Sequence, residues 1–73
     1  LDETESVLRQ LPGASCWDVT QRMTWSRPWA EVRGHMRRAA VGETLAHLVL
    51  LQADGRAHSQ AGDVIHWFNT AAA

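Results

Sequence analysis

The stretch from His35 to Gly55 constrains the fold more than any other part of the chain. It reads as one long amphipathic helix, because apolar residues recur at helical spacing and a glycine follows the last of them. No other segment carries so much apolar surface, so the shorter elements must pack on this helix to bury themselves. The expected inner stripe of the helix consists of Val41, Leu45, Leu48 and Leu51.

The long helix is expected to begin between His35 and Ala40 and to run to about Ala53. An Asp-Gly dipeptide then provides the turn that ends it. Gly42 lies inside the helix, where a glycine costs about 1 kcal/mol relative to alanine. We therefore expect Gly42 to pack closely against another backbone.

Two shorter helices are expected before the long one. Residues 2–11 form the first, which a Pro-Gly dipeptide ends. Residues 14–23 form the second, in which Ser15 and Asp18 have the spacing of a capping box. The expected inner face of this second helix consists of Cys16, Val19 and Met23.

The order of elements predicts the fold class. A break at residues 24–28 precedes one or two helical turns at 29–33, and residues 56–59 and 63–68 read as the strands of a hairpin. Helix, helix, short helical link, long helix and hairpin is the order of a winged helix, with the second and long helices as the helix-turn-helix pair. We expect residues 1–73 to be a single winged-helix domain, mostly α with a small β-hairpin.

Composition limits the partners and the cellular compartment expected for this chain. Seven arginines, no lysine and eight acids give a net charge of −1, whereas a domain that holds nucleic acid by charge is usually basic. The single cysteine, Cys16, excludes an internal disulfide and indicates a reducing compartment. No apolar run approaches the ~18 residues of a membrane span and no signal peptide is present, so we expect a cytoplasmic protein without a membrane partner. Because the chain begins at Leu1, we also expect further sequence upstream.

Nucleic-acid recognition is one candidate function, since the long helix takes the place of a recognition helix. Its outward positions lack base-reading groups, being Glu43, Ala46, His47, Val49 or Leu50, and Asp54. The candidate phosphate contacts are Arg33, Arg37, Arg38 and Arg56. The alternative, which we favour, is a solvated face on which Arg37 or Arg38 forms ion pairs with Glu31 or Glu43.

Catalytic and metal chemistry have no support in the sequence. The four histidines do not have the spacing of a zinc motif, and neither a second cysteine nor a cluster of carboxylates accompanies them. No Ser/His/Asp arrangement and no glycine-rich phosphate loop is present. We therefore assign no catalytic, cofactor-binding or metal-binding residue to this chain.

Three strings between Thr24 and Arg56 are distinctive: WSRPW at 25–29, MRRAA at 36–40 and GETLAHL at 42–48. They resemble the winged-helix domain appended to the C-terminus of metallo-β-lactamase-fold hydrolases of the β-lactamase-like protein 2 type. The resemblance implies an upstream catalytic domain that holds one or two metal ions, usually zinc, through an H-x-H-x-D-H motif. That motif does not occur in this chain, so no role in catalysis or metal binding transfers to its residues.

The resemblance implies a non-catalytic accessory domain that packs beside the catalytic domain and helps to shape the substrate cleft. Some relatives cut single-stranded RNA and others are thioesterases or glyoxalase-like, so the substrate does not follow from the family. Relatives often carry a charged residue at the position of Val49, which leaves an unusually wide apolar strip here. We expect this strip to dock on the catalytic domain or on a second copy of the chain. The docking candidates are Trp25, Trp29, Val49 and Leu50.

Two other functions stay open. The chain is alternatively a winged helix that binds nucleic acid, either as a transcriptional regulator or as a module that holds an RNA substrate, or it is a module for protein interaction. Salt-dependent binding to short RNA or DNA distinguishes the first from the others, because phosphate contacts weaken as salt rises.

Overall fold

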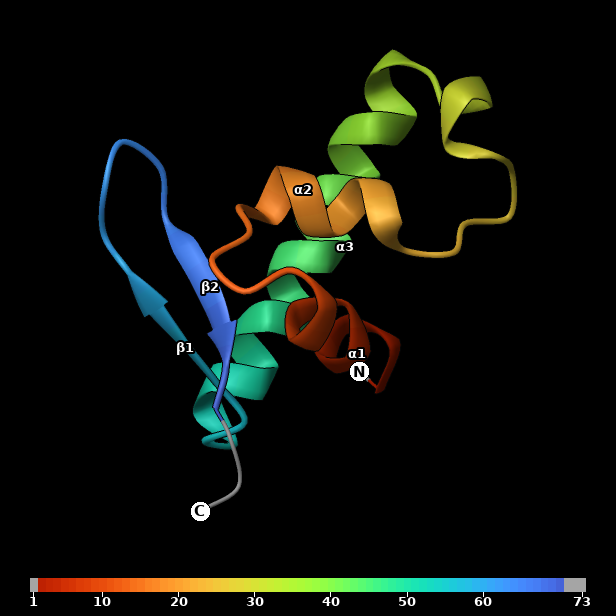
Figure 1. Ribbon diagram of the computed structural model, residues 1–73. Coiled ribbons are helices and arrows are strands. Elements are labelled where there is room, and N and C mark those ends of the chain that lie inside the picture. The colour runs from red at the N-terminus through yellow and green to blue at the C-terminus, as the bar shows by residue number, and fades with distance from the viewer. Residues whose placement is uncertain (1, 71–73) are drawn as a thin grey trace.

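The computed structural model describes residues 2–70, which form helices and one β-hairpin (Figure 1). Its elements are α1 (Asp2–Gln10), α2 (Cys16–Arg22), the 3-10 turn η1 (Trp29–Glu31), α3 (Gly34–Ala53), β1 (Ala57–Gln60) and β2 (His66–Asn69). The predicted class, mostly α with a small antiparallel hairpin, is confirmed. The three helices begin and end within one or two residues of their predicted bounds.

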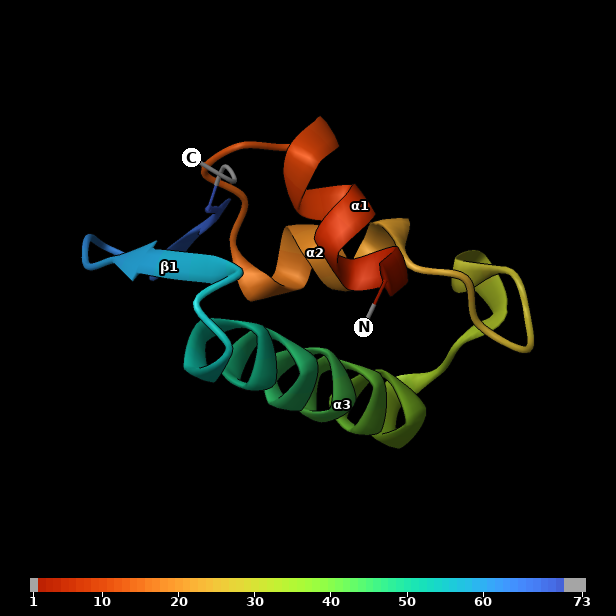
Figure 2. The same ribbon diagram turned by 90° about the horizontal axis from the view of Figure 1, so that it is seen from below.

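All the other packed elements meet α3 on one side or at one end. In Figure 2, α1 and α2 lie together above α3, and the hairpin lies at its C-terminal end. No other element covers the opposite side of α3 among the residues that the structure describes. The expectation that the short elements pack on the long helix therefore holds, and it leaves one side of that helix to solvent.

The buried side of α3 differs from the predicted stripe. It consists of Ala40, Thr44, Leu48 and Leu51. Leu48 and Leu51 are confirmed, but Leu45 is 43% exposed, so its prediction is wrong. Thr44 takes the inner position because its hydroxyl donates a hydrogen bond to the Ala40 carbonyl oxygen at 2.9 Å, which satisfies the polar group inside the core.

The capping box of α2 is formed as predicted. The Ser15 hydroxyl accepts a hydrogen bond from the Asp18 N–H at 3.1 Å, and the Asp18 carboxylate accepts one from the Ser15 N–H at 3.2 Å. On the inner face of α2, Val19 is fully buried, while Cys16 and Met23 are half-buried against the core. The inner face is therefore confirmed.

The hairpin is shorter in its second strand than predicted. Ala57 pairs with Asn69 and Gln60 pairs with His66, so the connection covers residues 61–65. Val64 and Ile65, predicted to lie in the second strand, belong to this connection and are exposed. In this register Trp67 pairs with Ser59, and its buried side chain lies within the paired part of the hairpin.

Trp67 joins the hairpin to the helices. Its side chain is only 3% exposed and belongs to the core cluster. Its N–H donates to the Ala14 carbonyl oxygen at 2.8 Å, and its own carbonyl oxygen accepts from the Gly13 N–H at 2.9 Å. The connection between α1 and α2 thus forms an isolated antiparallel bridge with β2. The core cluster comprises Val7, Leu8, Ala14, Val19, Leu48, Leu51, Ala57 and Trp67.

Two glycines, one inside α3 and one just beyond its C-terminal end, have different roles. Gly55 has φ +74° and ends the helix in a Schellman motif, in which the Arg56 N–H donates to the Leu51 carbonyl oxygen at 2.8 Å. Gly42 lies on the exposed side of α3, and a Cβ there would meet no atom within 4 Å. The expectation that Gly42 packs closely against another backbone is therefore wrong.

Alanine substitutions at these two glycines should change stability in opposite directions. Gly42→Ala should raise the free energy of unfolding by about 1 kcal/mol, because the helix gains a better helix former and no clash arises. Gly55→Ala, where the space is equally open, should lower it by about 1 kcal/mol because its φ is positive. Urea unfolding followed by circular dichroism measures both. A loss of stability in Gly42→Ala would contradict the exposed placement of Gly42.

Candidate functional site

Three tryptophans hold the linker between α2 and α3, residues 23–33. The ring of Trp29 lies 5.6 Å from that of Trp17 in an edge-on arrangement and 6.4 Å from that of Trp25. The Trp25 indole N–H also donates to the Thr20 carbonyl oxygen at 2.8 Å. Trp25 and Trp29, predicted to dock on a partner, are therefore half-buried against α2 and against each other.

Arg37 fastens the same linker to the first turn of α3. Its guanidinium lies 4.9 Å from the ring centre of Trp29, and its Nε donates to the Val32 carbonyl oxygen at 2.6 Å. The expected ion pairs of Arg37 or Arg38 with Glu31 or Glu43 are not formed within residues 2–70. Arg37 donates to two backbone carbonyls in place of carboxylates, which uses two of the five N–H groups of its guanidinium.

The four candidate phosphate contacts do not form one patch. Arg33 and Arg38 are exposed at the N-terminal end of α3, beside Arg37. Arg56 follows the other end of α3, which is about 30 Å long at a rise of 1.5 Å per residue. The Arg56 guanidinium pairs with Glu5. Only the three arginines at the start of α3 can act together.

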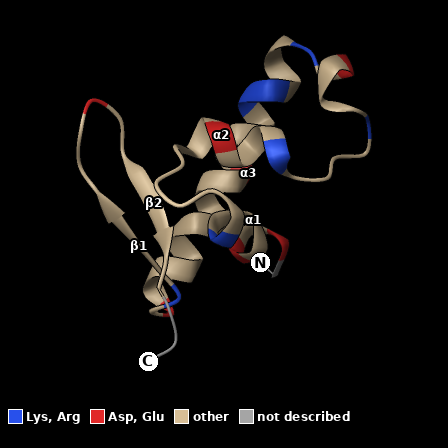
Figure 3. Cartoon of the chain, viewed as in Figure 1, with Lys and Arg blue, Asp and Glu red and all other residues tan. Residues whose placement is uncertain are grey.

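Charge is distributed unevenly along the chain. Residues 24–42 contain four arginines and a single acid, Glu31, whereas the rest of the chain contains three arginines and seven acids. Figure 3 shows the basic segments gathered around the linker and the first turns of α3. The end of the molecule that carries the linker is therefore positive although the net charge is −1.

The side of α3 that no other element covers is apolar. We call it the α3 outer face and define it by Leu45, Ala46, Val49 and Leu50, all of which are exposed. Val49 is 50% exposed and Leu50 is 53% exposed. Both docking candidates of the helix thus lie at the surface, four and five residues after Leu45.

A hollow of about 370 Å³ lies between α2 and the first half of α3. It is lined by Trp17, Arg37, Arg38, Val41 and Gly42, and we call it the Trp17 hollow. Trp17 is 44% exposed, and Gly42 contributes no side chain to fill the space. Sequence reasoning missed this hollow because it assigned Gly42 to close packing.

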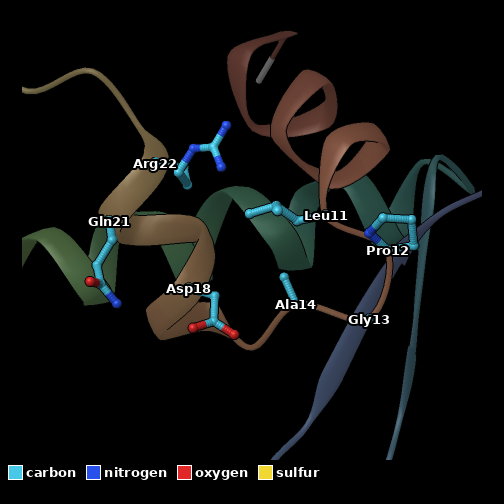
Figure 4. A pocket seen from close by; sticks show the side chains of 7 residues that line it. All are labelled: Leu11, Pro12, Gly13, Ala14, Asp18, Gln21 and Arg22. Carbon is cyan, nitrogen blue, oxygen red and sulfur yellow. The ribbon is translucent and has the colours of Figure 1, made fainter.

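Two other hollows have weaker claims to be a site. One of about 420 Å³ lies between α1 and α2 (Figure 4). Its charged groups are already engaged, since Asp18 caps α2 and Arg22 donates to the Gln10 side chain at 3.1 Å. The other, of about 230 Å³, is an apolar groove between the linker and α3, lined by residues that include Trp25, Val32 and Met36.

Cys16, His47 and His66 each make a contact within the fold. Within residues 2–70 no three His, Cys, Asp or Glu side chains are placed to hold a metal ion. Burial raises the pKa of the Cys16 thiol, whose Sγ donates a hydrogen bond to the Val41 carbonyl oxygen at 3.6 Å. His66 Nδ1 lies 2.9 Å from the Gly13 carbonyl oxygen. His47, expected on the outward side of α3, is half-buried with Nδ1 3.4 Å from the Thr4 hydroxyl.

Glu5 links α1 to the open end of the hairpin, where β1 begins and β2 ends. Its side chain accepts hydrogen bonds from the Arg56 guanidinium and from the Asn69 amide at 3.1 Å. These bonds, above all the one from Arg56, lower the pKa of the Glu5 carboxyl below its ordinary value of 4.5. The candidate phosphate contact Arg56 thus has a structural role in this cluster.

Comparisons with known proteins give no match: neither a family model, nor a curated protein, nor a solved structure corresponds to this chain. Among the helices of residues 2–70, none has the length and apolar character needed to cross a bilayer.

The Glu5 cluster predicts acid sensitivity. A carboxyl whose pKa is lowered by folding contributes stability above pH 4.5, and that contribution is lost as the pH falls through the folded-state pKa. Glu5→Gln should therefore be less stable than the parent at pH 7 and should lose less stability between pH 7 and pH 3. Thermal unfolding across this range measures the effect. Glu43→Gln, at an exposed position of α3, serves as the control and should follow the parent curve.

Proposed function

We propose that this chain is a non-catalytic accessory domain of winged-helix type that packs beside the catalytic domain of a metallo-β-lactamase-fold hydrolase. The three sequence strings between Thr24 and Arg56 support the family assignment. The observation that carries the docking role is the apolar α3 outer face. The catalytic domain would hold the zinc, and this chain would shape one wall of the substrate cleft. The single cysteine is consistent with a reducing compartment such as the cytoplasm.

The topology supports the winged-helix assignment. Three helices followed by a hairpin have the expected order, and the bridge between Ala14 and Trp67 adds a short strand-like segment between α1 and α2. The linker at residues 23–33 is longer than the turn of about three to four residues in a DNA-binding helix-turn-helix. This departure favours a supporting role for α3 over insertion into a DNA groove.

The α3 outer face supports docking for an energetic reason. From Leu45 to Leu51 all the residues of α3 except His47 are apolar, and a helical segment that is apolar on nearly every side is normally buried, yet α3 is covered on one side only. Covering exposed apolar area gains about 25 cal/mol per Å². Leu45, Val49 and Leu50 are therefore the residues that gain most from a partner.

The sequence upstream of Leu1 tests the family assignment directly. We expect the natural coding sequence to encode a catalytic domain with an H-x-H-x-D-H motif before this chain. An upstream region without that motif, such as a ligand-sensing domain, would overturn the assignment. Reading the coding sequence requires no folding assay, so its outcome is independent of any variant.

Charge on the α3 outer face should separate the two domains. In the polypeptide that includes the upstream domain, Val49→Glu with Leu50→Glu should speed the proteolytic release of this chain and lower hydrolase activity several-fold. The same pair of substitutions should leave the thermal midpoint of the isolated chain within about 5 °C of the parent. Each surface change is usually worth less than about 0.5 kcal/mol, and 1 kcal/mol shifts the midpoint of a domain of this size by about 4–8 °C.

Ile65→Glu is the matched control for that experiment. Ile65 is as exposed as Leu50 but lies in the hairpin connection, so its substitution should change neither proteolysis nor activity. Sedimentation of the isolated chain tests a second possibility, that the α3 outer face docks on a second copy of the chain. A dimer that Val49→Glu dissociates, together with unchanged release from the upstream domain, would assign the face to a second copy and contradict docking on the catalytic domain.

A further inference from the structure

The molecule exposes two apolar features of opposite form, one hollow and one protruding. The surface of the Trp17 hollow is almost entirely apolar, so Arg37 and Arg38 contribute mainly their methylene stems to its lining. The protruding feature is the end of the hairpin connection, which we call the hairpin tip and define by Asp63, Val64 and Ile65. Val64 is 52% exposed and Ile65 is 53% exposed. Each feature leaves apolar area in water, and each would remove that area from water by meeting the other.

The hairpin tip is supported by the residues at its base. Gly62 packs so closely that a Cβ there would lie 3.2 Å from Cδ2 of His66 and 3.2 Å from the Val64 carbonyl oxygen. The His66 ring is itself fixed, since its Nδ1 lies 2.9 Å from the Gly13 carbonyl oxygen. Val64 and Ile65 therefore project from a supported turn, which lowers the entropy that a contact through them would cost.

The Trp17 hollow is likewise formed before anything enters it. The ring of Trp17 meets that of Trp29 edge-on, with the ring centres 5.6 Å apart. Gly42 is unfavourable inside a helix, and a Cβ there would meet no atom within 4 Å, so packing within this copy does not require a glycine. The missing side chain leaves room for side chains that come from outside the copy.

Charge favours the hairpin tip as the occupant of the hollow. Asp63 is the only charged residue of the hairpin connection, and it forms no hydrogen bond or ion pair with another described residue. Arg38, at the rim of the hollow, is exposed and equally without such a partner among residues 2–70. Figure 3 shows an acidic position at the far end of the hairpin and basic segments around the start of α3. The tip thus combines two apolar side chains with the charge opposite to that of the rim.

The tip and the hollow of one copy lie too far apart to meet. The hairpin lies at the C-terminal end of α3, whereas the hollow lies beside its first half, and both views show the closed end of the hairpin well away from the start of α3 (Figures 1 and 2). We propose that the hairpin tip of one copy of this chain inserts into the Trp17 hollow of a second copy, with Ile65 against Trp17 and Asp63 beside Arg38. The contact joins two different patches, so the association is head-to-tail. It uses neither the α3 outer face nor an upstream domain, and so does not rest on the proposed function.

Sedimentation of the 73-residue chain over a range of concentrations tests the contact. We expect the average mass to rise above that of the monomer as the concentration increases. Ile65→Glu should raise the dissociation constant about tenfold or more by placing a carboxylate in an apolar hollow, and Gly42→Leu should do the same by filling the hollow. Both positions are open, so circular dichroism should show the helix content of the parent. Leu50→Glu, on the α3 outer face and as exposed as Ile65, is the matched control and should associate like the parent.

A mixture of the two defective variants is the decisive measurement. Ile65→Glu keeps an intact hollow and Gly42→Leu keeps an intact tip, so one complete contact remains between the two variants. An equimolar mixture should therefore form a heterodimer and no larger species, although each variant alone stays monomeric. A face that pairs with itself would show no such recovery.

An exchange of charges tests the orientation of the tip. Asp63→Arg and Arg38→Asp should each weaken the association several-fold, and the double variant should recover part of the loss because the two positions again carry opposite charges.

Three results would overturn the proposal. They are a parent chain that stays monomeric at its highest soluble concentration, an assembly that Leu50→Glu dissociates, and a mixture of Ile65→Glu and Gly42→Leu that stays monomeric. A monomeric parent whose proteolytic release from the upstream domain is speeded by Gly42→Leu would assign the hollow to that domain instead.

Discussion

The burial of Trp67 determines how the small elements of this molecule are joined. Its ring belongs to the same cluster as Leu48 and Leu51 of α3, and its backbone forms hydrogen bonds with Gly13 and Ala14. A buried tryptophan removes ~150–250 Å² from water, which is a large contribution in a chain of this size. Because Trp67 fixes β2, it also fixes the pairing of β1 and thereby the reach of Arg56 and Asn69 to Glu5. The hairpin is thus a part of the core and not a free appendage.

The one-sided coverage of α3 leaves the α3 outer face and the Trp17 hollow on the same helix. Val49 follows Gly42 by seven residues, or about 10 Å along the helix at its standard rise. A domain seated on the α3 outer face would therefore have its edge beside the Trp17 hollow. The proposed docking would use the apolar C-terminal half of α3, whereas Arg37 and Arg38 lie at the N-terminal end of the same helix.

Local rules of sequence predicted the elements well and their contacts less well. The capping box at Ser15 and the glycine that ends α3 depend on neighbouring residues only, and both are present. The inner stripe depends on what packs against the helix. The hydrophobic pattern predicted that Leu45 is buried, whereas Thr44 is buried instead and its hydroxyl donates a hydrogen bond within the helix. The exposed positions of Val49 and Leu50 were expected because the surplus of apolar residues on α3 exceeds what one inner face requires. The Trp17 hollow was not predictable, because it depends on the path of the linker and on the open space beside Gly42.

The arginines show that the net charge of the chain does not describe how its charge is distributed. A planar guanidinium lets Arg37 lie over Trp29 while donating to two carbonyls, and it lets Arg56 approach Glu5 with two nitrogens. A lysine ammonium would fit neither arrangement, so these two residues contribute to the fold through their shape as much as through their charge. Arg38 differs because no described residue holds its guanidinium, and its positive charge remains available to a ligand. The local surplus of arginine around α3 therefore matters more for an anionic partner than the value of −1 for the whole chain.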